Sequence, residues 1–316
     1  MRLAILGVGS VGGVLLGSLS DTGSELVCVS RGITAASLSS GLTLHTPEGT
    51  MEMIPGERYL VIDSESGPVP ASALGTCEVA VIAGKADSTE VLCSLAGDLL
   101  HEGGIAISVQ NGLGHAEVLS RRLGPDRVLG GSTTHSAWRD GDGSVHWTGR
   151  GSISMGKMDG SSQCGVSSRL VATLDEAGLN ARWSSDIKAD IWRKLLINVA
   201  INPVCAIAGV RNGALLEVPE LWAQSLEAMR EAEAVARASG IDLGEPDTEG
   251  HLRKVVESTA ANRVSMLQDL MAGRKTEIGV LCGAVVSKGE EMGIPTPRNE
   301  MLMALIRGIE LSQSFD

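Results

Sequence analysis

The sequence predicts an α/β protein, in which a doubly wound, mostly parallel sheet domain is followed by an all-helical domain. Two observations support this prediction. Short apolar segments alternate with helical segments up to about residue 185, a pattern typical of a parallel sheet covered by helices. After Ser185 no convincing strand remains, and helical periodicity dominates to the end. We therefore expect one domain over residues 1–185 and a second over 186–316.

The composition is that of a globular protein and excludes several classes of function. The chain has 316 residues, of which 43% are hydrophobic and 20% charged. Aromatic residues are scarce (Trp 5, Tyr 1, Phe 1), so the core must be built from aliphatic side chains. The net charge of −12 argues against a non-specific nucleic-acid binder and against a binder of anionic membranes. No run reaches the ~18–20 apolar residues of a transmembrane helix, so we expect a cytoplasmic protein with no nucleic-acid or membrane partner.

The cysteines predict neither a disulfide framework nor a metal site. No two of them form a C-x-x-C pair, and most lie in apolar runs, as buried, reduced thiols do. They show no ligand spacing with the six histidines, so we predict no metal. The six cysteines are Cys28, Cys77, Cys93, Cys164, Cys205 and Cys282.

The N-terminus has the pattern of a dinucleotide-binding turn. An apolar strand at residues 2–7 runs into a G-x-G-x-x-G motif and then into a helix. The motif residues are Gly7, Val8, Gly9, Ser10, Val11 and Gly12. In such a turn the first glycine permits a tight bend, the second lets a pyrophosphate approach the backbone, and the third lets helix and strand pack closely. The motif could arise by chance in a chain with 40 glycines. Its position between a strand and a helix favours a Rossmann-type domain, with phosphates bound at the helix N-terminus.

The end of the second strand, residues 26–30, selects the cofactor. An Asp or Glu there would bind the ribose 2′-hydroxyl of NAD. This chain has Ser30 and Arg31 instead, and a hydroxyl with a guanidinium suits the 2′-phosphate of NADP. The simpler alternative is an exposed arginine at a strand end. We predict NADP(H).

Two later strands, residues 78–83 and 104–109, are followed by the polar residues Lys85 and Asn111. Ligands of open α/β sheets bind at the carboxyl ends of the strands, so both could lie beside a nicotinamide. Each also has a simpler interpretation, as a solvated lysine and as the asparagine of an Asn-Gly turn. His135 we interpret as structural. Weaker patterns predict further strands, some of which could extend the sheet, at 42–45, 51–54, 59–62, 128–135, 144–147, 152–155 and 181–184.

Residues 191–202, IWRKLLINVAIN, combine an apolar helix with a polar stripe. Lys194, Asn198 and Asn202 recur at every fourth position and so share one helix face. Pro203 follows and predicts a kink or a helix end. Because a buried lysine is costly unless something pairs with it, we predict that the stripe faces a substrate and that Lys194 does acid–base chemistry. The alternative is a boundary helix whose lysine extends to water and whose asparagines bond to neighbouring helices.

The remaining helices are expected near residues 217–238, 247–271, 276–292 and 298–311. In the second of these, Asn262 and Ser265 are three apart and would share a face, although a hydrated surface would explain them equally well. Glu277 would lie in the first turn of the helix at 276–292, where the helix dipole favours a carboxylate in any case.

Taken together and in order, these segments resemble the ketopantoate reductases, also called 2-dehydropantoate 2-reductases, over nearly the whole chain. The matching segments are GVGSVG at the N-terminus, Lys85 after EVAVIA, VQNGLG around Asn111, GGSTTHSAWRDG at 130–141, DIWRKLLINVAINP at 190–203, SMLQDL at 265–270, RKTEI at 274–278 and GIPTP at 293–297. The Lys-x-x-x-Asn spacing also resembles that of the wider β-hydroxyacid dehydrogenases.

The resemblance implies a role for each matching residue. Lys194 would be the general acid, and Glu277 would orient the substrate and the lysine and lie near the cofactor. Arg31 and Lys85 would contact the NADP phosphates, and Asn111 would touch both substrate and cofactor. The substrate hydroxyl and carboxylate would be held by Asn198, Asn202, Asn262 and Ser265. Cys282 stands before Gly283 where many members have asparagine, which puts one secondary polar contact in doubt.

The resemblance implies NADPH-dependent reduction of 2-dehydropantoate to (R)-pantoate, a step toward pantothenate and coenzyme A. One alternative is a reductase of another branched 2-oxo acid. A second, from a different class, is a non-catalytic NADP-binding redox sensor, which would need neither Lys194 nor Glu277. The expected partner is a small 2-oxo acid, and the sequence leaves open whether the chain forms a homodimer.

Overall fold

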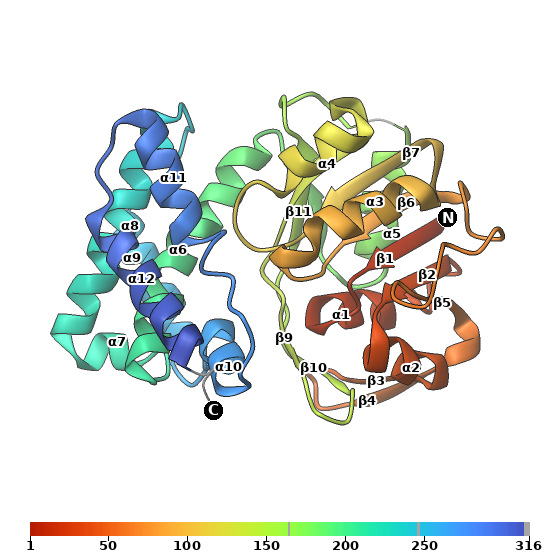
Figure 1. Ribbon diagram of the computed structural model, residues 1–316, viewed down its shortest axis with the longest axis horizontal. Helices are drawn as coiled ribbons and strands as arrows, with labels where there is room; N and C mark the ends of the chain where they lie inside the picture. The colour runs from red at the N-terminus through yellow and green to blue at the C-terminus, as the bar shows by residue number, and fades with distance from the viewer. Residues whose placement is uncertain (164, 245–246, 313–316) are drawn as a thin grey trace. The chain divides into compact units, whose positions relative to one another are not determined.

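The computed structural model describes residues 1–163, 165–244 and 247–312 (Figure 1). The chain divides into two compact units after Ile187, and each is described by itself. The first unit holds residues 1–110 and 115–187. The second holds residues 188–316 together with the short segment 111–114. Asn111 is therefore grouped with the helical unit, although it lies only three positions after Ser108, the last residue of a strand of the sheet unit.

An eight-stranded sheet forms the centre of the first unit, with strand order β12-β11-β8-β7-β6-β1-β2-β5. Six neighbouring strands, from β8 to β5, are parallel to one another, whereas β11 runs antiparallel to β8, and β12 runs parallel to β11. The predicted fold class is confirmed, since this is a mostly parallel, doubly wound sheet. The strands are β1 (Arg2–Leu6), β2 (Glu25–Ser30), β5 (Tyr59–Asp63), β6 (Cys77–Ile82), β7 (Leu100–Ser108), β8 (Val128–Thr133), β11 (Ile153–Lys157) and β12 (Ala181–Trp183).

Both faces of this sheet are buried, which explains why the central strands are continuously apolar. Along β1, Leu3 and Ile5 belong to one core cluster, whereas Ala4 and Leu6 belong to another on the opposite face. The helices that supply these two cores are α1 (Ser10–Leu19), α2 (Gly32–Ser40), α3 (Thr89–Leu99), α4 (His115–Leu123) and α5 (Gly165–Glu176). Short 3-10 turns lie at η1 (Gly56–Arg58), η2 (Ala86–Ser88) and η3 (Pro125–Arg127).

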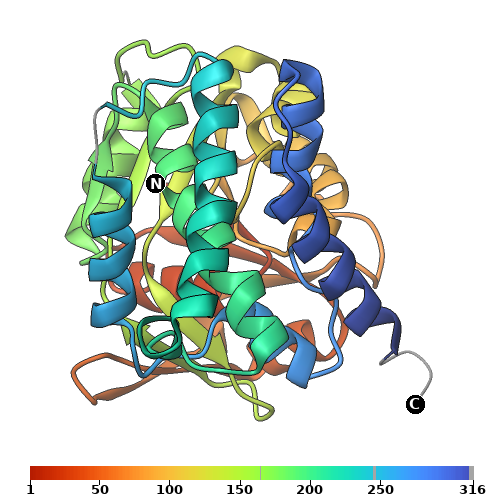
Figure 2. The ribbon, with the colours of Figure 1, turned by 90° about the vertical axis from the view of Figure 1, so that its left-hand side faces the viewer.

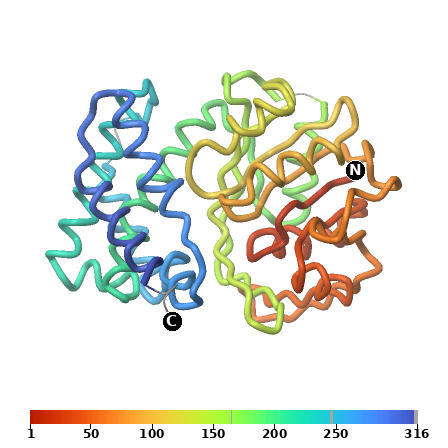
Figure 3. Tube along the Cα trace, viewed as in Figure 1, coloured from red at the N-terminus to blue at the C-terminus, as the bar shows by residue number. Residues whose placement is uncertain are grey.

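A second, four-stranded sheet of order β4-β3-β10-β9 was not predicted. The expected hairpin forms its β3–β4 half, and the trace in Figure 3 follows the chain through the sheet. The strand expected at 144–147 corresponds to β10, which pairs with β3 and β9 instead of extending the main sheet. The strands are β3 (Gly41–His45), β4 (Met51–Pro55), β9 (Ser136–Arg139) and β10 (Val145–Gly149).

The second unit is helical, as expected, and α11 and α12 both pack against α8 (Figure 2). Its core combines aliphatic residues from all the long helices, including Leu195 and Val199 of α6. The helices are α6 (Ile187–Ala208), α7 (Ala214–Glu217), α8 (Pro219–Ala238), α9 (Thr248–Ser258), α10 (Ser265–Met271), α11 (Cys282–Met292) and α12 (Pro297–Ser312).

The expected single helix at 247–271 is wrong, because the chain is not helical between α9 and α10. Carbonyl groups in this break accept hydrogen bonds from another segment: Asn212 N–H donates to Asn262 O (3.1 Å) and Gly213 N–H to Ala260 O (3.0 Å). The Asn212 side chain also donates to Thr259 Oγ1 (2.9 Å). These tertiary bonds stabilise the interruption, which helical periodicity alone does not reveal.

Two other helix boundaries differ from expectation. Of the two alternatives predicted at Pro203, a kink or a helix end, the helix end is wrong, because α6 continues through the proline to Ala208. Proline removes one N–H donor from the helix ladder, and here the buried packing of the segment outweighs that loss. Glu277 does not lie in the first turn of a helix, since α11 begins only at Cys282 and Glu277 belongs to the preceding turn.

The prediction of buried, reduced thiols is confirmed for the five cysteines that the structure describes. Cys28, Cys77, Cys93, Cys205 and Cys282 are free and buried, and burial raises the pKa of the Cys282 thiol to about 12. Cys164 lies outside the described residues.

One expectation about apolar segments needs correction. Among the described helices α6 alone has the length and composition of a membrane span, with a mean hydropathy of 1.3. However, 56% of that window is buried inside the protein, as is typical of the core helix of a soluble protein. Its polar stripe of Lys194, Asn198 and Asn202 is likewise unsuited to a lipid-facing surface.

Candidate active site

The glycine-rich turn between β1 and α1 has the geometry of a phosphate-binding loop. Gly7 has a φ of +88°, and a Cβ there would lie 2.3 Å from the Gly84 Cα. A Cβ on Gly12 would lie 2.3 Å from the Gly7 carbonyl oxygen. By contrast, a Cβ on Gly9 would meet nothing within 4 Å. The first and third glycines thus permit close packing within the protein, whereas the second leaves open space above the turn.

The first turn of α1 offers backbone donors beside this open space. Gly9 caps the helix without any side-chain hydrogen bond, and its carbonyl accepts from Gly13 N–H at 2.9 Å. The N–H groups of Ser10, Val11 and Gly12 have no hydrogen-bond partner within the described chain. Unpaired N–H groups at a helix N-terminus bind anions well, so this turn fits the diphosphate of a dinucleotide.

Arg31 and Lys85 both lie at the carboxyl ends of strands in the same sheet. Arg31 follows β2 directly, has extended backbone geometry and precedes α2, and its exposed guanidinium has no partner among the described residues. It is therefore available for an anionic ligand. Lys85 is also exposed and precedes η2, beyond β6.

Gln110 is a buried residue that the sequence reasoning missed. Its side-chain amide donates to Gly84 O (2.9 Å) and to Thr89 Oγ1 (3.0 Å), while its oxygen accepts from Ser108 Oγ (3.0 Å). It thus ties the turn that carries Lys85 to the end of β7. The only sequence signal for this role was its place in VQNGLG.

In the helical unit, Lys194, Asn111 and Glu277 form one hydrogen-bonded chain. Lys194 Nζ donates to Asn111 Oδ1 at 2.7 Å, and Asn111 Nδ2 donates to Glu277 Oε2 at 3.0 Å. Ammonium is only a donor and carboxylate only an acceptor, so a single orientation of the amide satisfies both. The structure therefore brings together three of the predicted site residues, which are 83 and 166 positions apart in the two bonded pairs.

The electrostatics of this cluster suit proton transfer near neutral pH. Desolvation of the half-buried lysine lowers the pKa of Lys194 to about 8, and the negative charge of Glu277 partly opposes that shift. A lysine with such a pKa is still largely protonated at pH 7 and gives up its proton more readily than a solvated one.

The backbone around Asn111 and Glu277 is fixed by close contacts. Gly112 has a φ of +90°, and a Cβ there would lie 2.3 Å from the Val280 carbonyl oxygen. Leu113 N–H donates to that same oxygen at 3.2 Å. Thr276 N–H donates to the Glu310 carboxylate at 2.7 Å. The Asn-Gly pair is therefore more than a surface turn, because its glycine lets the segment dock against the turn that carries Glu277.

The other four predicted substrate residues, Asn198, Asn202, Asn262 and Ser265, are not part of this hydrogen-bonded chain. Asn198 and Asn202 are half-buried on the same face of α6 as Lys194, and their side chains have no hydrogen-bond partner within the described ranges. Ser265 is the first residue of α10, and Asn262 lies in the break before it, so the two do not share a helix face as expected. Both are exposed.

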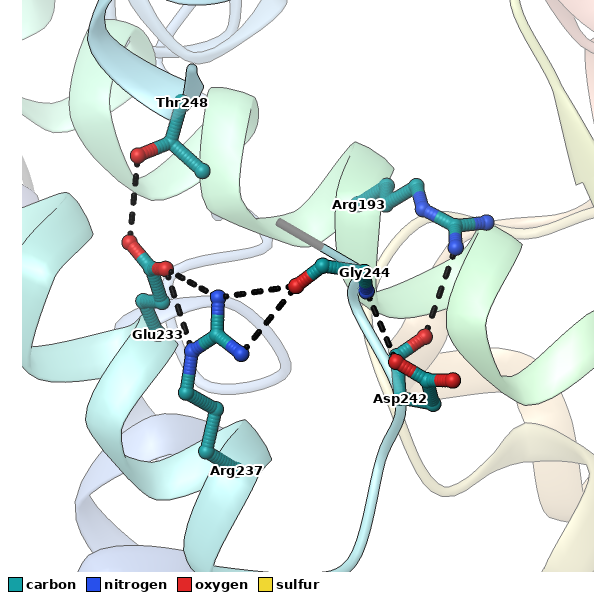
Figure 4. A network of polar contacts seen from close by, with 6 residues as sticks. All are labelled: Arg193, Glu233, Arg237, Asp242, Gly244 and Thr248. Atoms are coloured by element: carbon teal, nitrogen blue, oxygen red, sulfur yellow. Dashed lines mark hydrogen bonds and ion pairs between the residues drawn. The ribbon is translucent and has the colours of Figure 1, made fainter. Parts of the chain in front are cut away.

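A polar network positions the N-terminal half of α6, as Figure 4 shows. Arg193 Nη2, next to the site lysine, donates to Asp242 O at 3.3 Å. Asp242 Oδ1 in turn accepts from Gly244 N–H at 2.8 Å, and Arg237 Nη1 donates to Gly244 O at 3.2 Å. Glu233 completes the network with Arg237 (2.8 Å) and Thr248 (3.1 Å). The segment that follows α8 is thereby tied to both α6 and α8.

His135 is structural, as interpreted from the sequence. Its ring is buried, Gly151 N–H donates to its Nδ1 (2.9 Å), and its Nε2 bonds to Leu179 O (3.0 Å). Both ring nitrogens are satisfied in one neutral tautomer, and desolvation lowers the pKa of the imidazole. Among the described residues, no group of His, Cys, Asp and Glu could hold a metal ion.

A doubly wound sheet with this glycine turn, together with a helical unit that carries a desolvated lysine, defines an oxidoreductase with a Rossmann-type dinucleotide-binding fold. Family comparison agrees. The family described as ketopantoate reductase PanE/ApbA matches residues 3–160, and its C-terminal counterpart matches residues 186–310. The chain belongs to the ketopantoate reductase family.

Relatives of known name cover the whole chain. A 2-dehydropantoate 2-reductase of Archaeoglobus fulgidus is 33% identical over 309 residues, which are 98% of this chain and 98% of that protein. One from Halobacterium salinarum is 32% identical and covers 97% and 98%. The crystal structure of a PanE/ApbA family ketopantoate reductase from Ralstonia eutropha JMP134 has a TM-score of 0.88 at 28% identity and covers 99% of this chain and 100% of its own.

The same fold also occurs in an enzyme of another name. The ternary structure of D-mandelate dehydrogenase with NADH and anilino(oxo)acetate has a TM-score of 0.89 at 24% identity and covers 99% of this chain. At that identity the likeness concerns the fold alone.

Proposed function

We propose that this protein reduces 2-dehydropantoate to (R)-pantoate with NADPH, in the biosynthesis of pantothenate and coenzyme A, and that it acts in the cytoplasm. The observation that carries the proposal is the hydrogen-bonded chain from Lys194 through Asn111 to Glu277. The full-length relatives named for this reaction support the substrate.

Lys194 is the proton donor in this proposal. When bound, the reduced nicotinamide supplies a hydride to the ketone carbon. The Lys194 ammonium donates a hydrogen bond to the ketone oxygen and then transfers its proton as negative charge develops there. Desolvation, which lowers the pKa of Lys194 to about 8, favours this transfer because the neutral amine is less costly in the site than the ammonium.

Asn111 and Glu277 orient the lysine. Asn111 Oδ1 holds one Nζ–H, which fixes the direction of the two other ammonium hydrogens. Glu277 fixes the Asn111 amide and also keeps the lysine protonated by Coulombic attraction. The free amides of Asn198 and Asn202 continue along the same face of α6 and would bind the hydroxyl and carboxylate of the substrate. Asn262 and Ser265 are weaker candidates for the same task, since they lack a shared helix face.

Arg31 is the residue proposed to select NADPH. It has a free guanidinium at the end of β2, where a 2′-phosphate would lie in a Rossmann-type site, and Lys85 would add a second cation. An aspartate does occur nearby, at the end of β5. However, the Asp63 carboxylate already accepts from the N–H groups of Gly32 (3.2 Å) and Glu65 (3.0 Å) and from Ser66 Oγ (2.6 Å). Its acceptors are therefore occupied by the protein itself.

The decisive test is the loss of reduced-nicotinamide absorbance with purified protein and 2-dehydropantoate, using NADPH and NADH in parallel. We expect rapid loss with NADPH and slow loss with NADH. Tight NADPH binding without loss would contradict the substrate, and other branched 2-oxo acids would then be assayed. Absence of turnover with all of them would favour the non-catalytic redox sensor.

A further inference from the structure

The hairpin formed by β9 and β10 contains part of the GGSTTHSAWRDG segment. No residue of this segment has a role in the reaction proposed above. Its strands belong to the second sheet, and one face of that sheet packs against α1. A Cβ on Gly13 would lie 2.5 Å from Val145 Cγ2, and one on Gly17 would lie 2.5 Å from Leu44 Cδ2. The two glycines are one helical turn apart, so α1 lies flush against β10 and β3 because it has no side chains at these points.

Arg139 extends from this hairpin to the glycine-rich turn. Its Nη1 donates to the carbonyl oxygen of Val8 at 2.7 Å, across 131 positions of sequence. Val8 lies between Gly7 and Gly9, and its own side chain is fully buried. The carbonyl of this residue is therefore held from outside the turn by a charged donor, the stronger kind of hydrogen bond.

The turn of the hairpin is itself fixed. The Asp140 carboxylate accepts from Ser144 N–H (2.8 Å), from Asp142 N–H (3.1 Å) and from His146 Nε2 (2.9 Å). Gly143, with a φ of +91°, packs so closely on α2 that a Cβ there would lie 2.7 Å from Ser37 Oγ. The hairpin thus contacts α1, which begins at the phosphate turn, and α2, which begins directly after Arg31.

The charge of Arg139 is only partly compensated. The guanidinium is half-buried, and desolvation lowers the pKa of Arg139 although Asp140 and Tyr59 act in the opposite direction. Its hydrogen-bond partner within the described chain is a neutral carbonyl. A desolvated cation beside an anion-binding turn would be stabilised when an anion occupies that turn.

We infer that Arg139 is a positioning residue for the dinucleotide, which holds the Val8 carbonyl so that the N–H groups of residues 10–12 stay directed at the diphosphate. This inference rests on the proposed function only in that the ligand is a nicotinamide dinucleotide. Because the diphosphate is common to both cofactors, Arg139 supports NADPH and NADH alike. It thereby differs from Arg31, whose proposed contact exists only in NADPH.

The test compares Arg139→Gln and Arg139→Lys with a matched control, Arg150→Gln. Arg150 also places a guanidinium beside the second sheet. Its Cζ lies 4.2 Å from the centroid of the Trp147 ring, and its Nε lies 2.5 Å from Glu48 Oε1, instead of contacting the glycine-rich turn. Dissociation constants for NADPH and NADH are measured by nucleotide fluorescence, alongside melting temperatures without ligand. We expect Arg139→Gln to raise the dissociation constants of NADPH and NADH about tenfold, which is the scale of one charged hydrogen bond. The dissociation constants of Arg139→Lys should lie between those of Arg139→Gln and those of the wild type. The kcat of both variants at saturating NADPH should stay near the wild-type value.

Several outcomes would overturn the inference. Folded Arg139 variants that bind both cofactors as wild type does would show a merely structural role, whatever their melting temperatures. Weakening of NADPH alone would assign the residue to the 2′-phosphate, and equal weakening by Arg150→Gln would make the effect non-specific. If Arg139→Gln does not fold, Arg139→Lys decides. Wild-type protein that binds neither cofactor would contradict this inference and the proposed function together, whereas binding without turnover would contradict only the latter.

Discussion

The glycine-rich turn and the lysine cluster would contact their ligands with different parts of the chain. The turn uses backbone, and its key positions are defined by the absence of a side chain: a Cβ at Gly7 or Gly12 would collide with backbone at 2.3 Å. The cluster uses side chains from distant segments, and its key property is the desolvated charge of Lys194. Mutations in the two regions should therefore have different effects: those in the turn should reduce stability and cofactor binding, and those in the cluster should reduce the reaction rate.

The largest expected effect separates rate from binding. Lys194→Ala should lower turnover by two or more orders of magnitude, the usual scale for loss of a general acid, while NADPH still binds. Single-turnover kinetics and nucleotide fluorescence measure the two quantities. Lys188→Ala is the matched control, because Lys188 is exposed on the same helix. Near-normal turnover in Lys194→Ala would remove the assignment of the general acid.

The next effect divides two glycines of one turn. Gly12→Ala should destabilise the protein by about 1–3 kcal/mol, since its Cβ meets the Gly7 carbonyl and the backbone must shift. Gly9→Ala should cost much less stability, because nothing lies within 4 Å of its Cβ, yet it should weaken NADPH binding by occupying the space left for the diphosphate. Urea unfolding and cofactor titration distinguish the two. Equal stability losses would contradict this division of roles.

A smaller effect concerns cofactor choice. Arg31→Ala should weaken the binding of NADPH about tenfold or more and leave the binding of NADH nearly unchanged. The reason is that the 2′-phosphate would lose a charged hydrogen bond that NADH never makes. The ratio of the two dissociation constants is the measurement. An equal loss for both cofactors would mean that Arg31 acts on a part they share.

The smallest expected effect is a gain of stability, whereas most substitutions lower the free energy of unfolding. Lys194→Met should raise the free energy of unfolding at pH 7, because a desolvated ammonium is replaced by an apolar side chain of similar length. In wild type the folded-state pKa of about 8 lies below the ordinary lysine value of 10.5, so the unfolded chain binds more protons between them. Stability from this group should therefore rise between pH 8 and 10.5. Denaturant titrations at several pH values check both statements, and a destabilised Lys194→Met would contradict the desolvation argument.

Sequence reasoning succeeded where the signal is local. The glycine turn, the buried parallel strands and the polar stripe of α6 follow from spacing alone. It failed where distant segments decide the structure. The second sheet forms because β10 finds β3 and β9 as partners, and the break before Ser265 is stabilised by bonds from Asn212 and Gly213.

The candidate site shows the same division. Lys194 was found from its own helix, but its contact with Asn111 spans 83 positions, and no periodicity predicts such a pair. Asn111 was noticed because it follows a predicted strand, but its roles and those of Glu277 beside the lysine came from the family resemblance. The hydrogen bond between Arg139 and Val8 entered only with the structure, because a charged residue in a strand resembles an ordinary edge position.

The pH dependence of kcat/KM for 2-dehydropantoate at saturating NADPH tests the central claim, that the Lys194 ammonium delivers the proton. Below its pKa of about 8 the lysine is charged and can donate, and above that pH it cannot. We predict that the reduction rate begins to fall near pH 8, that oxidation of pantoate rises over the same range, and that the limb disappears in Lys194→Ala. A rate that stays level through pH 10, or a limb that persists in the variant, would contradict the account.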